Sequence, residues 1–463
     1  MSNVLIVTGD TLGSAMAGPA IRALEMAKAL SMVSTVTLAT TVPTTFTHEG
    51  FDVVDATDSN LRGLVNWSDI IVFQGALLST HPWIAKTNKI IVADVYDPMH
   101  LETLEQQKHI PAGIRFVETM DIVAVFNEQL ARADFMLCAS EKQRDLWLGQ
   151  LAAVGRLNPL TYDRDTSLRS LIDVVPFGIQ ETAPVRQKHG IRDVIPGIGM
   201  GDKVVLWGGG IYNWFDPLTL IRAIGQISIK HSEIKLVFMG TQHPNPHVPE
   251  MKMSFKAREL SKELGLEGKH VFFNEGWVPY NERANFLLDA DLGVSTHLDH
   301  LETAFSFRTR ILDYLWAGLP IVATNGDTFE AIIEGNMLGK TVPPGNVELL
   351  AEAITELLFN DDFSQTAREN VNQYSDNLKW NLVLRPLIDF VVGAQHAADF
   401  KSGFSEGITK LAHVGRRTLR QRMFIYFLSV RLNGFKYSTD LFLKNLLGKS
   451  LRKFKKLLKI NQN

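Results

Sequence analysis

The chain has 463 residues, too many for one compact core, which predicts two or three domains. Hydrophobic residues make up 45% and charged residues 21%, proportions typical of a globular protein with a sizeable core. The single cysteine, Cys138, excludes a disulfide framework. The sequence shows no signal peptide and no apolar run near the ~20 residues of a membrane-spanning helix, so we expect a cytoplasmic protein.

Charge is distributed unevenly along the chain. Residues 401–463 hold 15 Lys or Arg and two acids, which gives this stretch about +13 and leaves about −16 of the net −3 to the rest. Leu447, Leu451, Phe454 and Leu458 recur at helical spacing among basic residues, which predicts a basic amphipathic helix. We expect the tail, residues 396–463, to rest on an anionic membrane surface. A disordered tail and nucleic-acid binding are the alternatives, but no known nucleic-acid fold accompanies it, so no nucleic-acid partner is expected.

The first half of the chain alternates short apolar segments with helical ones. Residues 4–8, 35–39, 70–73, 90–93 and 135–138 are rich in β-branched and other apolar side chains, as in the buried strands of a parallel sheet. Residues 18–30 predict a helix, because Pro19 suits the first turn and Ala20, Leu24 and Ala27 share one face. Residues 1–188 are therefore expected to form a Rossmann-like domain.

The pattern restarts after a break. Residues 189–203 contain four glycines and a proline and predict a linker. Apolar segments in KVVLW, IKLVF, HVFF, DLGVS and LPIVAT follow, with a helix that begins at Asp216 and Pro217. The sequence thus predicts an α/β protein with two doubly wound, Rossmann-like domains, 1–188 and 189–375, facing each other across a cleft. Residues 376–395 are expected to form a helix that crosses back to the first domain.

Ligands of such folds bind beyond the carboxyl ends of the strands, so the loops there carry the candidate sites. In GDTLGSAMAGP (9–19), Gly13 and Gly18 allow a ligand to approach the backbone at a helix N-terminus. The spacing differs from G-x-G-x-x-G, which argues against an oxidoreductase. A tight turn without a ligand is the other interpretation.

Two loops of the second half are candidates for binding a nucleotide. In WGGGIYNWFD (207–216), the consecutive Gly208, Gly209 and Gly210 suit a backbone whose amides face a diphosphate. In GWVPY (276–280), Trp277 and the backbone of Val278 are placed to hold a nucleobase, although Trp277 also fits a core position.

The segment 295–320 carries the densest charge pattern. Ser306 can cap a helix that starts near Phe307, which places Arg308 and Arg310 in a first turn where the helix dipole disfavours cations. Their position suggests an anion shared with the helix N-terminus, such as a phosphate. Asp313 shares a face with Arg310 and can accept hydrogen bonds from ribose hydroxyls. A solvated charged face is the alternative.

The same segment contains a possible metal cluster, His297, Asp299 and His300. No partner of defined spacing accompanies these residues, so we interpret them as surface polar residues and expect no metal site.

The stretches ILDYLWAGLPIVATNGD, SEKQRDLWL and VVPFGI resemble signatures of the retaining glycosyltransferases of family 4. Asp313 stands at the second glutamate of the family's Glu-x7-Glu motif, and Gly318 and Pro320 match the glycine and proline of the family signature that follows this position. The resemblance covers roughly residues 1–395. It implies the GT-B fold, with residues 1–188 binding the acceptor and residues 189–375 binding the nucleotide sugar. It also implies a hexosyltransferase-type enzyme that moves a sugar from a nucleotide-diphosphate donor with retention. The nucleotide sugar is then a substrate, and neither a cofactor nor a metal is expected.

The chain departs from the family pattern at several positions. Phe305 occupies the place of the first motif glutamate, and Glu302 is the nearest acid. Gln74 stands where many relatives have histidine, and Asp94 and Asp97 lie where relatives place another cleft residue. We expect Gln74, Asp94, Asp97 and Glu302 to orient the sugar and the acceptor.

The first loop of the second domain lacks the family's Arg/Lys pair, a charge that Arg308 and Arg310 can supply. Together with the basic tail, the resemblance predicts transfer to a glycan or lipid-linked acceptor in cell-envelope polysaccharide biosynthesis, at the inner face of the cell membrane. The alternative, favoured by Phe305, is a non-catalytic GT-B-like subunit that binds a glycan or a sister transferase.

Overall fold

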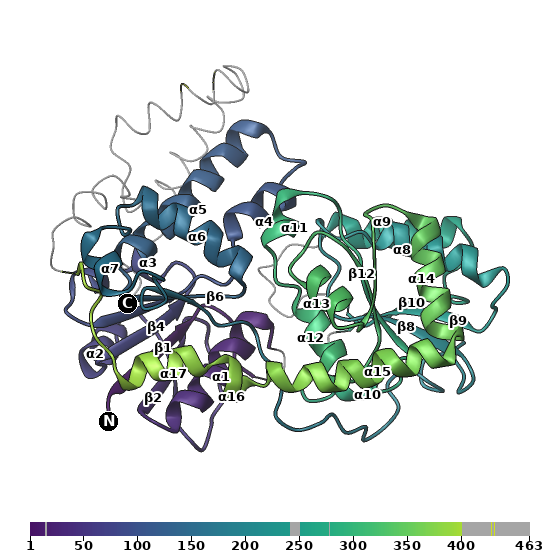
Figure 1. Ribbon diagram of the computed structural model, residues 1–463, viewed down its shortest axis with the longest axis horizontal. Coiled ribbons are helices and arrows are strands. Elements are labelled where there is room, and N and C mark those ends of the chain that lie inside the picture. The colour runs from purple at the N-terminus through teal and green to yellow at the C-terminus, as the bar shows by residue number, and fades with distance from the viewer. Residues whose placement is uncertain (14–15, 241–250, 277, 401–426, 428–429, 431–463) are drawn as a thin grey trace, which may run out of the picture.

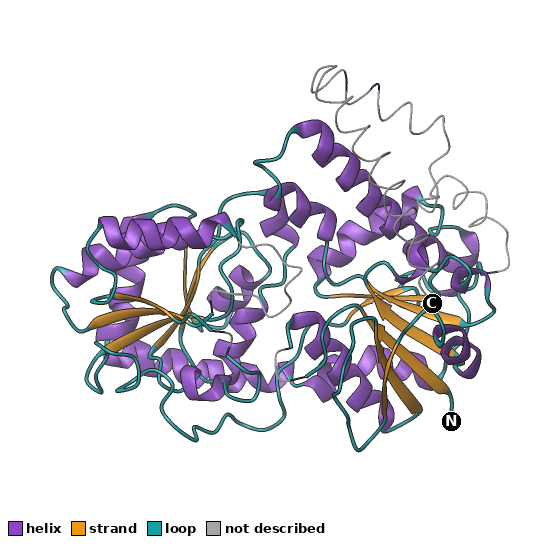
Figure 2. Cartoon of the chain, turned by 180° about the vertical axis from the view of Figure 1, so that it is seen from behind, coloured by secondary structure: helices purple, strands orange, loops and turns teal. Residues whose placement is uncertain are grey.

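The computed structural model describes residues 1–13, 16–240, 251–276 and 278–400, with residues 427 and 430. Two α/β domains lie next to each other along the long axis of the molecule (Figure 1). Each contains one parallel sheet with helices on both of its faces, as the view from behind shows (Figure 2). The predicted class, two doubly wound domains, is confirmed.

The first domain is built on a seven-stranded sheet of order β3-β2-β1-β4-β5-β6-β7, in which all paired strands are parallel. Its strands are β1 (Asn3–Thr8), β2 (Thr35–Thr40), β3 (Asp52–Asp55), β4 (Ile70–Gln74), β5 (Ile90–Asp94), β6 (Phe135–Cys138) and β7 (Ile172–Val174). Its helices are α1 (Gly18–Ser31), α2 (Leu61–Trp67), α3 (Leu77–Thr80), η1 (Ile84–Lys86), α4 (Met99–Gln106), α5 (Ala112–Arg132), α6 (Glu141–Ala153) and α7 (Pro159–Arg164). The five predicted strands are present, and β3 and β7 are short edge strands with acidic residues that weaken their apolar pattern.

The second domain is built on a six-stranded parallel sheet of order β10-β9-β8-β11-β12-β13. Its strands are β8 (Lys203–Trp207), β9 (Ile234–Phe238), β10 (Val271–Phe273), β11 (Leu292–Ser295), β12 (Ile321–Thr324) and β13 (Gly339–Val342). Its helices are α8 (Pro217–Ser228), α9 (Lys252–Glu263), α10 (Arg283–Leu287), α11 (Leu301–Phe305), α12 (Thr309–Trp316), α13 (Phe329–Gly335), α14 (Val347–Phe359) and α15 (Asp361–Ser375). Asp216 caps α8 by accepting a hydrogen bond from the Thr219 amide, as predicted.

Buried side chains form three hydrophobic layers. One layer covers the face of the first sheet that carries α5 and α6, and a second covers the face of the other sheet that carries α8 and α14. The third layer is shared, because it contains Val4 and Ile6 of β1 together with Val204 and Leu206 of β8. This continuous layer fixes how the carboxyl ends of the two sheets face each other.

The chain passes between the domains at two adjacent places. Ile179 donates its amide to the Leu378 carbonyl over 2.8 Å, and its carbonyl accepts from the Trp380 amide over 3.1 Å. The expected crossing helix is broken into η2 (Asp376–Leu378), α16 (Trp380–Val383) and α17 (Arg385–Val392), because Lys379 is extended and Pro386 opens a new helix. The last of these lies on the first domain, where Phe390 stacks on Phe135 at 4.4 Å.

The segments at the expected domain boundaries are ordered. Asp289 accepts hydrogen bonds from the amides of residues 190–192, so the predicted linker packs against the second domain at its start. Residues 396–400 pack on the first domain, where Asp399 pairs with Arg156 over 2.9 Å. The predicted amphipathic helix of the tail lies outside the described residues. Among the residues that are described, no helix has both the length and the apolarity needed to cross a membrane.

Candidate active site between the two domains

A cavity of about 920 Å³ lies between the domains, at the carboxyl ends of β1, β4 and β5 on one side and of β8 and β9 on the other. The predicted site residues that line it are Gly18, Gln74, Asp94, Asp97, Gly208, Gly209, Gly210, Val278, Glu302, Arg308, Arg310 and Asp313. Gly13, which has a φ of 148°, is not among the lining residues, and Trp277 lies outside the described part of the chain. Segments more than 200 residues apart in the sequence therefore meet in one cavity, as the topology predicted.

Arg310 is a buried cation that two aromatic rings and a backbone carbonyl hold at the cavity. Its guanidinium lies over the rings of Trp207 and Phe215, at 4.2 and 4.1 Å, and Nη2 donates to the Gly210 carbonyl over 2.9 Å. Nη1 is buried and has no hydrogen-bond partner among the described residues. Burial lowers the pKa of Arg310 to about 10, which leaves it charged at neutral pH. A buried cation with a free donor that faces a cavity is prepared for an anionic ligand.

Arg308 also lines the cavity, with a buried Nε that has no partner among the described residues, but a carboxylate neutralises its charge. Its guanidinium forms two hydrogen bonds, of 3.0 and 2.8 Å, with the carboxylate of Glu302, and both side chains are almost fully buried. Each of these side chains thus neutralises the other, whereas the sequence suggested that Arg308 faces a phosphate and that Glu302 orients the sugar. The reason is local, since the turn between α11 and α12 brings residue 302 opposite residue 308.

The start of α12 also differs from the prediction. Ser306 does not cap this helix, because it ends α11 and its hydroxyl donates to the Thr303 carbonyl over 3.0 Å. Helix α12 begins at Thr309, with Arg308 as its N-cap residue.

Asp313 lines the cavity beside a second arginine. Its carboxylate lies 2.9 Å from Nε of Arg283, whose guanidinium is held between the rings of Tyr280 and Trp316 at 3.7 and 4.4 Å. Burial raises the pKa of Asp313, and the positive charge of Arg283 counteracts that rise. Arg283 was missed by the sequence reasoning, although its position three residues after Tyr280 was visible.

The three glycines are used in different ways. The Gly208 amide donates to the Tyr314 hydroxyl over 2.8 Å, so this amide is engaged within the domain and does not face a ligand as predicted. Gly209 has a φ of 80°, a left-handed conformation that favours glycine. The Gly210 carbonyl accepts from Arg310 and from Nε1 of Trp207. The loop therefore fixes the arginine and the backbone around it.

On the first-domain side, Asp94 is part of a buried ion pair. Arg22 donates to its two carboxylate oxygens over 2.6 and 2.9 Å, and both side chains are fully buried. Gln74 donates Nε2 to the same carboxylate over 3.0 Å, while its Oε1 has no partner among the described residues. Asp94 therefore holds the side chain of Gln74 in place. The sequence did not predict that Arg22, on α1, would be the ion-pair partner of Asp94.

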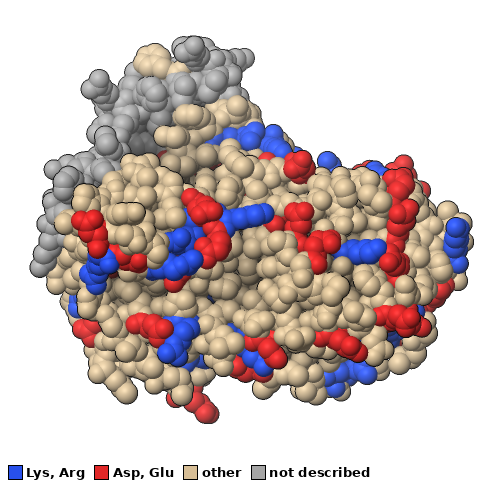
Figure 3. All heavy atoms as spheres, in the orientation of Figure 1, with Lys and Arg blue, Asp and Glu red and all other residues tan. Residues whose placement is uncertain are grey.

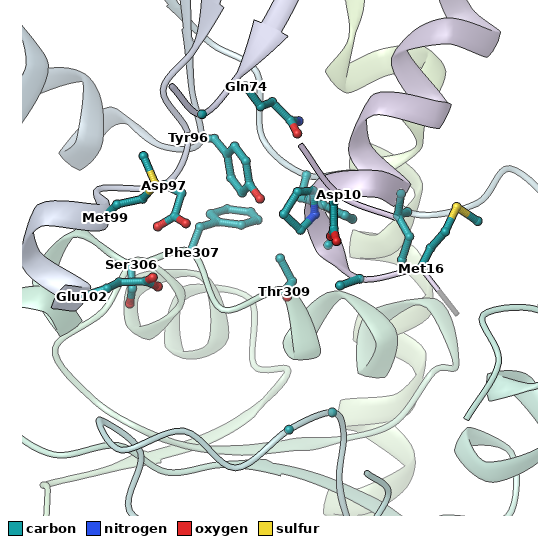
Figure 4. A pocket seen from close by; sticks show the side chains of 18 of the residues that line it. Asp10, Met16, Gln74, Tyr96, Asp97, Met99, Glu102, Ser306, Phe307 and Thr309 are labelled. Carbon is teal, nitrogen blue, oxygen red and sulfur yellow. The ribbon is translucent and has the colours of Figure 1, made fainter. Parts of the chain in front are cut away.

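A group of acids lies where the two domains approach. Asp97 and Glu102, from the loop after β5 and from α4, lie close to Ser306 of the second domain at one end of the cavity (Figure 4). Burial and the charges of Glu302 and Asp94 raise the pKa of Asp97 to about 7. The pKa of Glu102 is also raised well above its usual value, by burial and by the charges of Asp97 and Glu302.

Other side chains complete the wall of this cavity. Tyr96 and Phe307 lie between the acids and Asp10, which sits toward the other end near Met16 (Figure 4). Glu102 and Tyr96 were not predicted, although both lie in the segment that follows the identified Asp94.

The possible metal cluster is dispersed. His297 is buried, with Nε2 3.6 Å from Asp327, while Asp299 is exposed. The interpretation as surface residues is therefore wrong for His297, which the turn after β11 carries into the interior. Within the described part of the chain, no group of three or more His, Cys, Asp or Glu side chains is arranged to hold a metal ion.

Comparison with known proteins identifies similar sequences and structures. Residues 202–360 match a family model described as "Glycosyl transferases group 1". Sucrose-phosphate synthase from Thermosynechococcus elongatus is a structural relative with a TM-score of 0.61 and 15% identity, covering 85% of this chain and all of its own. Anabaena HepE in complex with UDP-glucose has a TM-score of 0.61 at 14% identity, with the same coverage.

A third relative, WaaG, described as a glycosyltransferase involved in lipopolysaccharide biosynthesis, has a TM-score of 0.56 at 15% identity and again covers 85% of this chain and all of its own. The chain has the GT-B fold. No curated protein matches the sequence. In this GT-B protein, the family model lies within the domain that carries Arg310, and the cavity lies between the two domains.

Proposed function

We propose that the protein is a glycosyltransferase that moves a sugar from a nucleotide-diphosphate donor to a glycan or lipid-linked acceptor. The observation that carries this proposal is Arg310, a buried guanidinium in the cavity between the domains whose Nη1 finds no hydrogen-bond partner in the described part of the chain. A departing diphosphate needs its developing charge stabilised, and a fixed guanidinium in a water-poor site serves this purpose. The family match over residues 202–360 supports a donor site in the same domain.

The donor is bound without a metal in this proposal. Arg310 and the N-terminus of α12 carry the positive charge at the diphosphate, and Asp313 and the backbone of Val278 lie where ribose and base would follow. Structural relatives support uracil as the first base to examine, because HepE is described in complex with UDP-glucose and an E. coli relative as bound with UDP-2-fluoro glucose.

We propose that the reaction proceeds with retention, as the family resemblance implies. The bond from the anomeric carbon to the diphosphate oxygen breaks, and the acceptor oxygen forms a bond on the same face of that carbon. The acceptor proton passes to a diphosphate oxygen, so no protein base is required. Gln74 and Asp97 face the cavity from the acceptor side and are proposed to orient the hydroxyls.

The acceptor and location are proposed from the tail. Figure 3 shows Lys and Arg interspersed with Asp and Glu on the visible face of the body, whereas residues 401–463 concentrate about +13. A concentrated basic segment binds anionic lipid by about 1 kcal/mol per basic residue near the surface. We therefore propose a cytoplasmic protein held at the inner face of the cell membrane, acting on lipid-linked glycans in cell-envelope polysaccharide biosynthesis.

The proposed donor site is tested by thermal stabilisation with UDP, GDP, TDP, ADP and NAD. One nucleoside diphosphate should raise the unfolding temperature by several degrees, because binding to the folded state stabilises it by mass action. Arg310→Met should weaken that binding by ~1–3 kcal/mol, and the matched control Arg222→Met, on an exposed position of α8, should not. Equal affinity for the nucleoside diphosphate in wild type, Arg310→Met and Arg222→Met would show that Arg310 does not belong to the donor site.

A non-catalytic subunit remains a second candidate. Phe305 replaces the first motif glutamate, and Glu302, the nearest acid, is already paired with Arg308. Release of UDP from UDP-glucose without acceptor separates the two functions. Turnover supports the enzyme, whereas tight UDP binding with no release of UDP over hours supports a binding subunit.

A further inference from the structure

Several contacts between the domains gather at the amino end of α6. Lys142 donates Nζ to the Asp327 carbonyl over 3.1 Å, and Thr328 donates its hydroxyl to Oγ of Ser140 over 3.4 Å. Gln143 donates Nε2 to the Phe305 carbonyl over 2.8 Å. A single helix end of the first domain thus binds two loops at the carboxyl edge of the second sheet.

Both atoms of the side-chain amide of Gln143 form hydrogen bonds. Its side chain is completely buried, and Oε1 accepts from the Ala139 amide over 2.8 Å. Nε2 donates twice, to the carbonyls of Tyr96 and Phe305, each over 2.8 Å. Each of these partly buried carbonyls would lose its hydrogen bond to the amide, which makes the arrangement costly to disturb.

The two carbonyls belong to the two segments that form the acidic end of the cavity. Tyr96 directly precedes Asp97, and Phe305 ends α11, the helix that carries Glu302. We propose that Gln143 is a positioning residue that fixes the arrangement of the two domains and thereby the separation of Asp97 from Glu302. The inference rests on the proposed function, since it assigns Gln143 to the same site.

A fixed contact between the domains is needed because the acids at this end of the cavity repel each other when they are ionised. Asp97, Glu102 and Asp94 of the first domain line the same cavity as Glu302 of the second domain. Arg22 neutralises Asp94 and Arg308 neutralises Glu302, but no salt bridge to Asp97 or Glu102 occurs among the described residues. Above the raised pKa of Asp97 the acids carry like charges at the domain boundary, which favours opening, and the neutral double donor of Gln143 opposes that opening without adding charge.

Small-angle X-ray scattering of the full chain tests the positioning directly. Gln143→Met should increase the radius of gyration, because the domains lose the central bridge. Gln150→Met is the matched control, since Gln150 lies on the same helix and bonds Asn127 within the first domain over 2.8 Å. Identical scattering of wild type and both variants would overturn the proposal. If Gln143→Met does not fold, Gln143→Glu keeps the acceptor for Ala139 and removes both donors.

The kinetic test uses hydrolysis of UDP-glucose as a function of pH. We expect kcat of Gln143→Met to fall roughly tenfold, the usual cost of a lost buried hydrogen bond, with KM nearly unchanged. Separation from Glu302 removes a like charge from Asp97, so the pH midpoint linked to this carboxyl should move to lower pH. A loss of rate with an unmoved midpoint would indicate a structural role and overturn the proposal. If wild type neither binds UDP nor hydrolyses UDP-glucose, the proposed function fails, while the scattering result still decides the role of Gln143.

Discussion

Replacing Arg22 with methionine would leave the Asp94 carboxylate buried without its countercharge. The guanidinium of Arg22 donates to both oxygens of Asp94 and also to the carbonyls of Val175 and Pro176, over 2.8 and 2.9 Å. Removing one member of a buried ion pair typically costs about 3–5 kcal/mol of stability, because an uncompensated charge remains in a medium of low polarity. We expect Arg22→Met to lower the free energy of unfolding by this amount.

Urea unfolding followed by circular dichroism measures this loss, and a double variant tests its cause. Arg22→Met combined with Asp94→Leu removes both charges and should recover at least about 2 kcal/mol relative to Arg22→Met. Gln74 also loses its acceptor in the double variant, so UDP-glucose turnover should stay low even where stability returns. A double variant as unstable as the single one would show that the uncompensated charge is not the origin of the loss.

Three further predictions concern pH, the donor and the tail. Asp97 has a folded-state pKa of about 7, above its unfolded value. Its contribution to the free energy of unfolding is therefore present at low pH and is lost as pH rises from about 4 to 7. Asp97→Asn should abolish that part of the pH dependence in urea titrations. Asp313→Ala should weaken nucleotide binding by ~1–3 kcal/mol in calorimetry, and an unchanged affinity would exclude Asp313 from the donor site. Truncation before Lys401 should release the protein from anionic vesicles in sedimentation while UDP binding persists, and a truncated form that still sediments would contradict the role of the tail.

The sequence predicts the architecture well for a physical reason. Central strands of a parallel sheet are buried on both faces, so β1, β4, β5 and β6 appear as continuous apolar segments. The edge strands β3 and β7 lack this signature because they are half-exposed and carry aspartates. The Asp216–Pro217 helix start is equally local and was predicted from two residues.

The site was predicted less completely, because its pairings depend on tertiary contacts. The residues that line the cavity follow from topology, but the partner of each charge does not. Arg22 reaches Asp94 across 72 positions, and no periodicity in the sequence connects them. Arg308 and Glu302 are six residues apart, yet their pairing depends on the break between α11 and α12, which the helix-cap prediction at Ser306 had misplaced.

The paired crossing at Ile179 and Trp380 makes the second domain an insertion in the first. The chain leaves the first domain and returns to it at neighbouring points, and the returning segment ends on β6 through Phe390. The second domain is therefore a unit whose two junctions with the first domain lie side by side. Exchanging it for the corresponding domain of another GT-B protein would require only those two cuts and would leave the sheet of the first domain intact, so recombination can form new pairs of domains wherever the hydrophobic layer shared by β1 and β8 is kept.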